Sequence, residues 1–123
     1  MAYENVIVEK SFRFALQIIE FAELLEENKK YVIAKQILKA GTSIGANIKE
    51  AQSAESKADF IHKLKIADKE ANELEYWLQL CKMAENYPNP TLLERELLEI
   101  KKLLSKIIST SKANLKPTTE NQK

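Results

Sequence analysis

One unbroken series of apolar residues limits the fold of this chain more than any other feature. The apolar residues recur at alternating intervals of four and three residues, at Phe60, Leu64, Ala67, Ala71, Leu74, Leu78 and Cys81. This spacing is the heptad pattern of a long helix that packs along other helices. The two prolines of Asn86–Pro90 then end the helix.

Three further segments have the periodicity of amphipathic helices. Residues 4–27 carry two adjacent apolar stripes: Phe12, Ala15, Ile19 and Ala22 form one, and Phe14, Ile18, Phe21 and Leu25 form the other. A second helix is expected from the turn at residues 28–30 to about Ala54. A fourth is expected from Thr91, with the stripe Leu93, Leu97, Ile100, Leu104 and Ile107.

Two helix starts carry recognisable capping sequences. Ser56 with Asp59, and Thr91 with Glu94, have the spacing of a capping box. Residues 112–123 are polar and contain Pro117, so we expect a disordered tail after a domain that spans residues 1–111. Short connections make successive helices antiparallel. The chain therefore predicts an all-α, up-down-up-down antiparallel four-helix bundle.

The only two glycines, Gly41 and Gly45, lie within the second predicted helix. A glycine inside a helix costs about 1 kcal/mol relative to alanine. Because the two are four residues apart, they share one face of the helix, and such a gap lets another backbone come close. We therefore expect a close helix contact there.

Composition excludes several classes of protein. The formal net charge is +1, so the whole chain has no strong attraction for nucleic acid or for a membrane surface. A single cysteine cannot form an internal disulfide, and neither a signal peptide nor a membrane-spanning run is evident. We expect a cytoplasmic protein that contacts no membrane.

Catalytic or metal-binding patterns are sparse. His62 is the only histidine, and no second ligand lies near it at helical spacing, so we interpret it as a surface residue. Cys81 closes the apolar heptad series and is interpreted as a small buried hydrophobe. Glu70 and Glu73 share a helix face, yet one histidine cannot supply the paired ligands of a carboxylate-bridged metal bundle. We expect no enzyme activity, no cofactor and no metal.

Charge is unevenly distributed among the predicted helices. The first helix is acidic, while the second and fourth are rich in lysine: Lys29, Lys30, Lys35, Lys39, Lys49, Lys101, Lys102 and Lys106. One interpretation is that acidic and basic helices pair across the bundle or between subunits. The other is that these lysines form a strip for phosphate groups. The sequence leaves both interpretations open.

A second stripe on the glycine-containing helix is small and polar. It follows Gln36, Ala40, Ser43, Asn47, Glu50 and Ala54. Its residues are either plainly exposed or part of a protein contact that needs close approach and hydrogen bonds.

Two segments resemble a known family. Residues 36–51, which contain both glycines, and residues 60–78 are similar to the second- and third-helix motifs of the four-helix bundle proteins encoded in intervening sequences of bacterial 23S rRNA genes. The entry into the first helix at residues 10–12 also resembles that family, which includes, more distantly, the accessory variability protein of diversity-generating retroelements. The resemblance implies a homopentameric ring, a non-enzymatic role and, for some relatives, nucleic-acid binding.

Two hypotheses follow for the function. In the first, a homo-oligomer, expected to be a pentamer, binds structured RNA or DNA weakly through the eight lysines named above. In the second, the oligomer is a scaffold that binds another protein and no nucleic acid. The expected oligomer or helix contacts are Phe14, Ile18, Phe21, Leu25, Gly41, Ser43, Gly45 and Asn47. The surplus apolar stripe of residues 4–27 motivates the oligomer, because a bundle core uses one face of each helix.

Overall fold

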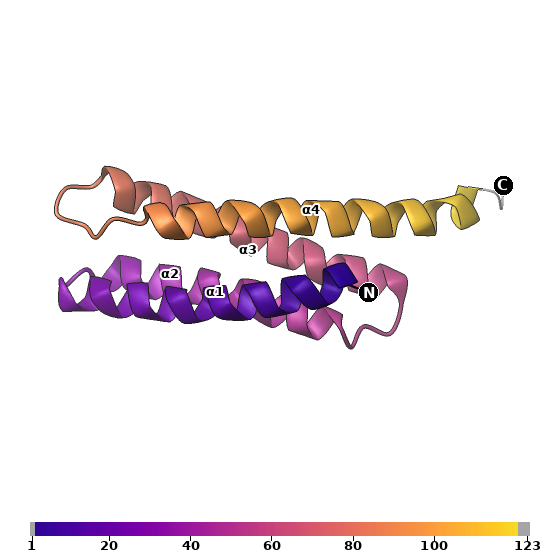
Figure 1. Cartoon of the computed structure of the whole chain (residues 1–123), viewed down its shortest axis with the longest axis horizontal. Helices are drawn as coiled ribbons and strands as arrows, with labels where there is room; N and C mark the ends of the chain where they lie inside the picture. Colours follow the sequence, from indigo (N-terminus) through magenta and orange to yellow (C-terminus); the bar gives the residue numbers. More distant parts are fainter. Residues whose placement is uncertain (1, 121–123) are drawn as a thin grey trace.

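Four α-helices make up the protein in a computed structural model that describes residues 2–120, and the side chains of residues 6–114. The helices are α1 (Ala2–Glu27), α2 (Tyr31–Ala51), α3 (Lys57–Met83) and α4 (Thr91–Glu120). Each runs opposite to the one before it, and α4 returns to lie beside α1 (Figure 1). The predicted all-α four-helix bundle is confirmed.

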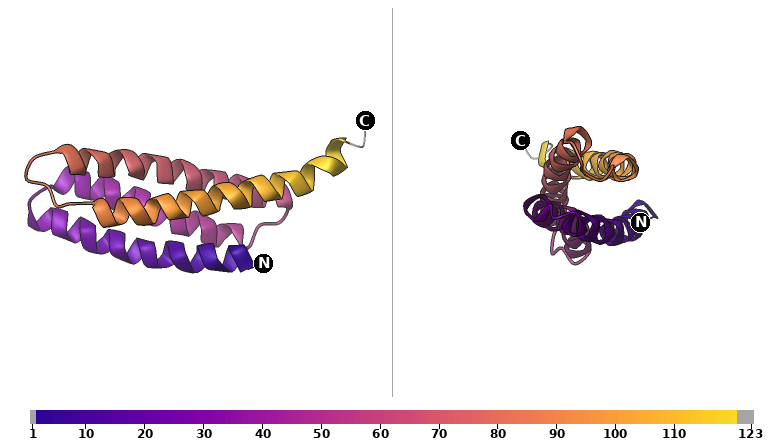
Figure 2. Two further views of the ribbon diagram at one scale, coloured as in Figure 1. Left: turned by 45° about the horizontal axis from the view of Figure 1, so that its top comes forward. Right: turned by 90° about the vertical axis from the view of Figure 1, so that its left-hand side faces the viewer.

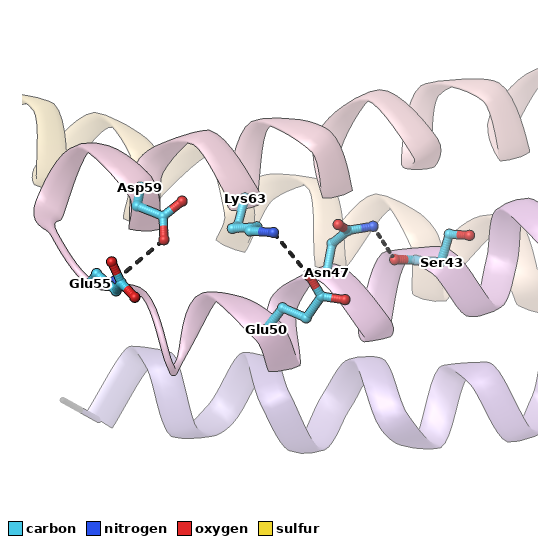
Figure 3. Close-up of polar contacts among 6 residues, drawn as sticks. All are labelled: Ser43, Asn47, Glu50, Glu55, Asp59 and Lys63. Atoms are coloured by element: carbon cyan, nitrogen blue, oxygen red, sulfur yellow. Dashed lines mark hydrogen bonds and ion pairs between the residues drawn. The ribbon is translucent and has the colours of Figure 1, made fainter.

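The start of α3 agrees with the capping sequence. The Ser56 hydroxyl accepts a hydrogen bond from the Asp59 backbone N–H at 3.0 Å. The Asp59 carboxylate in turn accepts from the Glu55 backbone N–H at 3.3 Å (Figure 3). Aspartate, shorter than the usual glutamate, thus satisfies the N–H group one residue before the cap.

The start of α4 differs from the predicted capping box. α4 begins at Thr91, but the Thr91 hydroxyl donates to the Asn89 side chain at 2.6 Å. That same Asn89 oxygen accepts from the Thr91 backbone N–H at 2.9 Å, and the Glu94 N–H donates to the carbonyl of Pro90. Asn89 therefore provides the cap that the sequence pattern assigned to a Thr91–Glu94 pair.

Two helix ends also differ from the sequence-based expectation. α2 ends at Ala51, because the N–H groups of residues 52–54 bond to carbonyls three residues earlier, in tighter turns. α4 continues to Glu120, past the predicted domain boundary at residue 111. Residues 121–123 of the predicted tail lie outside the described residues, and the division into domain and tail stays a prediction.

The core lies between the four helices and takes one apolar stripe from each. The heptad residues of α3 from Leu64 to Cys81 are buried, while Phe60 packs partly buried at the core's edge. The α4 stripe from Leu93 to Ile107 is buried throughout. Of the two stripes on α1, the core takes the one formed by Phe14, Ile18, Phe21 and Leu25.

The glycines of α2 lie at the contact between α1 and α2. A Cβ atom added to Gly41 would lie only 2.6 Å from Cγ2 of Ile18 on α1. A Cβ atom on Gly45 would lie 3.2 Å from the backbone oxygen of Ser11. The missing side chains allow α1 and α2 to approach this closely, which offsets the helix-propensity cost of two glycines.

Among the described residues, none of the helices combines the length and the apolar character needed to span a membrane.

Candidate interaction surfaces

The two lysine-rich helices are not neighbours in the bundle. Within residues 2–120, α2 packs against α1 and α3, α4 packs against the same two helices, and the backbones of α2 and α4 do not come close to each other. Viewed along the bundle, α2 and α4 occupy opposite corners (Figure 2). The eight candidate lysines therefore cannot form one continuous strip on a single protomer.

Three of these lysines have partners within the protomer. The Lys101 ammonium lies 2.7 Å from the Glu75 carboxylate of α3. Lys30 lies over the ring of Tyr87, 4.7 Å from its centroid, and so joins the α1–α2 turn to the α3–α4 loop. Lys106 also has an interaction partner. Acid–base pairing between helices thus accounts for part of the charge pattern.

The remaining candidate lysines are exposed: Lys29, Lys35, Lys39, Lys49 and Lys102. No ion pair within the described part of the chain involves them. Lys35, Lys39 and Lys49 recur at helical spacing along α2, so this helix presents uncompensated positive charge. Lys29 lies in the α1–α2 turn, where its φ of 64° lets the chain leave α1.

A groove of about 510 Å³ runs between α1 and α2 on the outer surface, and most of its lining is apolar. Phe12 and Ala15 of α1 form one wall, and Gly45 and Ala46 of α2 form the other. Glu9 and Lys49 lie at its edge. The Ser11 backbone of α1 packs closely against Gly45, so α1 and α2 are in tight contact at this part of the lining. Exposed apolar surface of this kind usually marks an interaction site.

The polar stripe of α2 lies partly against α3 and partly open to solvent. The Ser43 hydroxyl donates to the Lys39 carbonyl at 2.7 Å, and the Asn47 amide donates to the Ser43 carbonyl at 2.9 Å. One turn further on, Glu50 pairs with Lys63 of α3 at 3.0 Å (Figure 3). Ser43 and Asn47 are half-buried, and these two hydrogen bonds stay within α2, so their role in an oligomer contact stays a prediction.

The two residues weighed as catalytic candidates, His62 and Cys81, both lie on α3. Within residues 6–114, no group of three or more His, Cys, Asp or Glu side chains could hold a metal ion. His62 is exposed on α3. The thiol of Cys81 is buried in the core, and burial, with a smaller contribution from the charge of Glu94, raises its pKa to about 11.

The raised pKa of Cys81 predicts that its thiol reacts slowly in the native state. At pH 8 the native Cys81 thiol is expected to be almost entirely protonated, since the thiolate forms only as the pH approaches about 11. We therefore expect slow labelling by a thiol-specific disulfide reagent in the native state and fast labelling in urea. Equal rates in the two conditions would contradict the buried position.

Comparison with known proteins identifies the family. Residues 3–109 match the family described as 23S rRNA-intervening sequence protein. The chain belongs to this family. This match confirms the family resemblance seen in the sequence, and the observed four-helix bundle is the fold that the resemblance implied.

A solved relative has the same fold. It is a protein of unknown function from the S23 ribosomal protein family of Bacteroides thetaiotaomicron VPI-5482, which is 48% identical to this chain. The match covers 87% of this chain and 98% of the relative, with a TM-score of 0.81. No curated protein sequence matches the chain.

Several exposed apolar side chains were not anticipated from the sequence. Leu16, Leu38, Tyr76, Leu80 and Leu98 are all at least partly open to solvent. Each is one or two residues away in sequence from a buried residue of the same helix. Whether such a side chain is exposed therefore depends on how the helix is rotated about its axis. The heptad of α3 does indicate that rotation, because Tyr76 and Leu80 fall between the core positions Leu74, Leu78 and Cys81.

Proposed function

We propose that the protein is a non-enzymatic, self-associating four-helix bundle whose α2 lysines bind the phosphates of RNA or DNA weakly. The observation that carries this proposal is the row of exposed lysines Lys35, Lys39 and Lys49, none of which takes part in an ion pair among the described residues. The family resemblance favours a ring of five copies.

Repetition of the α2 lysines in an oligomer would raise an affinity for nucleic acid that is weak for one copy. The chain has 19 basic and 18 acidic residues, so one protomer cannot offer a large positive field. An oligomer presents the same α2 lysines several times to one polyanion, and multivalency raises the apparent affinity without any new contact. Binding should therefore be weak, tolerant of sequence and sensitive to salt.

Titration of fluorescently labelled duplex DNA and structured RNA at two salt concentrations tests this proposal. We expect the triple variant Lys35→Gln, Lys39→Gln, Lys49→Gln to bind less tightly. Its slope of log affinity against log salt on duplex DNA should fall by about 0.9 for each phosphate that the variant no longer neutralises. The matched control is Lys63→Gln with Lys101→Gln, because Glu50 and Glu75 already neutralise these two lysines.

Tight binding that does not respond to salt would refute phosphate recognition by these lysines. A triple variant that binds like the wild type, while the control variant does not, would place the nucleic-acid contact on another face.

A protein-interaction scaffold is the second candidate function. The apolar groove between α1 and α2 favours it, because an apolar surface does not bind phosphate groups. The scaffold predicts no binding of RNA or DNA even at low salt, which distinguishes it in the same titration.

A further inference from the structure

The groove between α1 and α2 has one charged end and one uncharged end. The two helices run in opposite directions, and the glycine contacts fix their register, so the first lining residues of α1 lie beside the last ones of α2. Val8, Glu9 and Lys49 therefore lie at one end of the groove. Ala15 and Thr42 lie at the other, where the Thr42 hydroxyl already donates to a carbonyl of its own helix at 2.7 Å.

The charged end carries a net positive charge. The Lys49 ammonium is exposed and forms no ion pair among the described residues. The acidic side chains beside it, in the groove and in the sequence, have other partners: Glu9 pairs with Arg13 at 2.9 Å, and Glu50 pairs with Lys63 at 3.0 Å. Lys49 is thus the uncompensated member of these five charged groups, and it can pair with an anion that enters the groove.

The size and lining of the groove suit a small ligand with an apolar body. Its volume of about 510 Å³ lies within the usual range for small-molecule sites. Such sites are lined mainly by apolar side chains, and a few polar groups fix the orientation of the ligand. The lining extends over two turns of each helix, which is about 10 Å along the axis. An extended medium-chain fatty acid has a comparable length.

We propose that this groove binds a medium-chain carboxylate, with its head group at Lys49 and its hydrocarbon chain between Phe12 and Ala46. The chain would extend toward Ala15, and its burial would supply most of the affinity, because an exposed ion pair contributes little. Lys49 would fix the direction in which the ligand lies. The inference does not rest on the proposed nucleic-acid binding, since a phosphate backbone has no hydrocarbon chain to bury.

A titration with octanoate, followed by NMR of protein with methyl-labelled alanine and valine, tests this site. We expect the methyl signals of Val8, Ala15 and Ala46 to shift. Lys49→Gln should weaken the binding of octanoate by about two- to fivefold, the range for an exposed ion pair. The same variant should bind octanamide like the wild type, because the amide carries no charge. Ala46→Leu should abolish the binding of both ligands, because the larger side chain fills the groove.

The matched control is Lys35→Gln, which removes an exposed lysine of α2 that does not line the groove and should bind octanoate like the wild type. Ala46 is exposed and leucine is a good helix former, so Ala46→Leu is expected to fold, which circular dichroism checks. Absence of octanoate binding, or methyl shifts confined to other parts of the protein, would overturn the site. Unchanged binding to Ala46→Leu would also overturn it. An equal loss of octanoate and octanamide in Lys49→Gln would refute the pairing of Lys49 with the carboxylate.

Discussion

Phe14→Ala is expected to lower the free energy of unfolding by about 3–5 kcal/mol, the largest effect among the substitutions proposed for this protein. The Phe14 side chain is 1% exposed and lies in the core among residues from all four helices. Its removal loses the transfer free energy of the ring and leaves a cavity that the neighbouring helices fill only in part. Urea denaturation followed by circular dichroism measures the difference.

The matched control lies two residues earlier on the same helix. Phe12 is 65% exposed, so Phe12→Ala removes the same ring without creating a cavity. We expect it to change protomer stability by less than about 1 kcal/mol, measured at a concentration low enough to exclude assembly. If Phe12→Ala proved as destabilising as Phe14→Ala, the assignment of the two α1 stripes to surface and core would be wrong.

Gly41→Ala is expected to destabilise the protein by about 1–3 kcal/mol, although alanine is the better helix former by about 1 kcal/mol. The added methyl group would lie within 3 Å of three side-chain atoms of Ile18. Ile18 is fully buried and branched at Cβ, so it cannot rotate away without a steric cost. Thermal and urea denaturation should both show the loss.

A double-mutant cycle identifies the cause of that loss. Ile18→Ala removes all three of the crowding atoms. In that background Gly41→Ala should cost much less than in the wild type, or even stabilise α2 through its helix propensity. Equal effects in the two backgrounds would show that Gly41 is required for a reason other than its contact with Ile18.

The family resemblance and the fold were both predictable from local patterns. The heptad series from Phe60 to Cys81 repeats with the period of a packed helix, and periodicity is a property of the chain alone. Ser56 and Pro90 border helices for equally local reasons, since a cap or a missing N–H group acts on its own turn. The glycine pair likewise indicated a close contact, although not which helix supplies it.

The interaction surfaces depended on tertiary structure. Two apolar stripes on α1 are visible in the sequence, but which one enters the core depends on where α2 and α4 pack. The role of Lys101 was equally open, since its partner Glu75 lies on another helix and becomes a neighbour only in the bundle.

By itself, then, the sequence determined the type, number and approximate bounds of the helices, because hydrophobic period, caps and prolines act within a few residues. Only the tertiary structure decided that Phe14 is buried while Phe12 is exposed, and that α2 and α4 lie at opposite corners. The physical reason is that burial and charge pairing belong to contacts between residues distant in the chain, and helix packing sets those contacts.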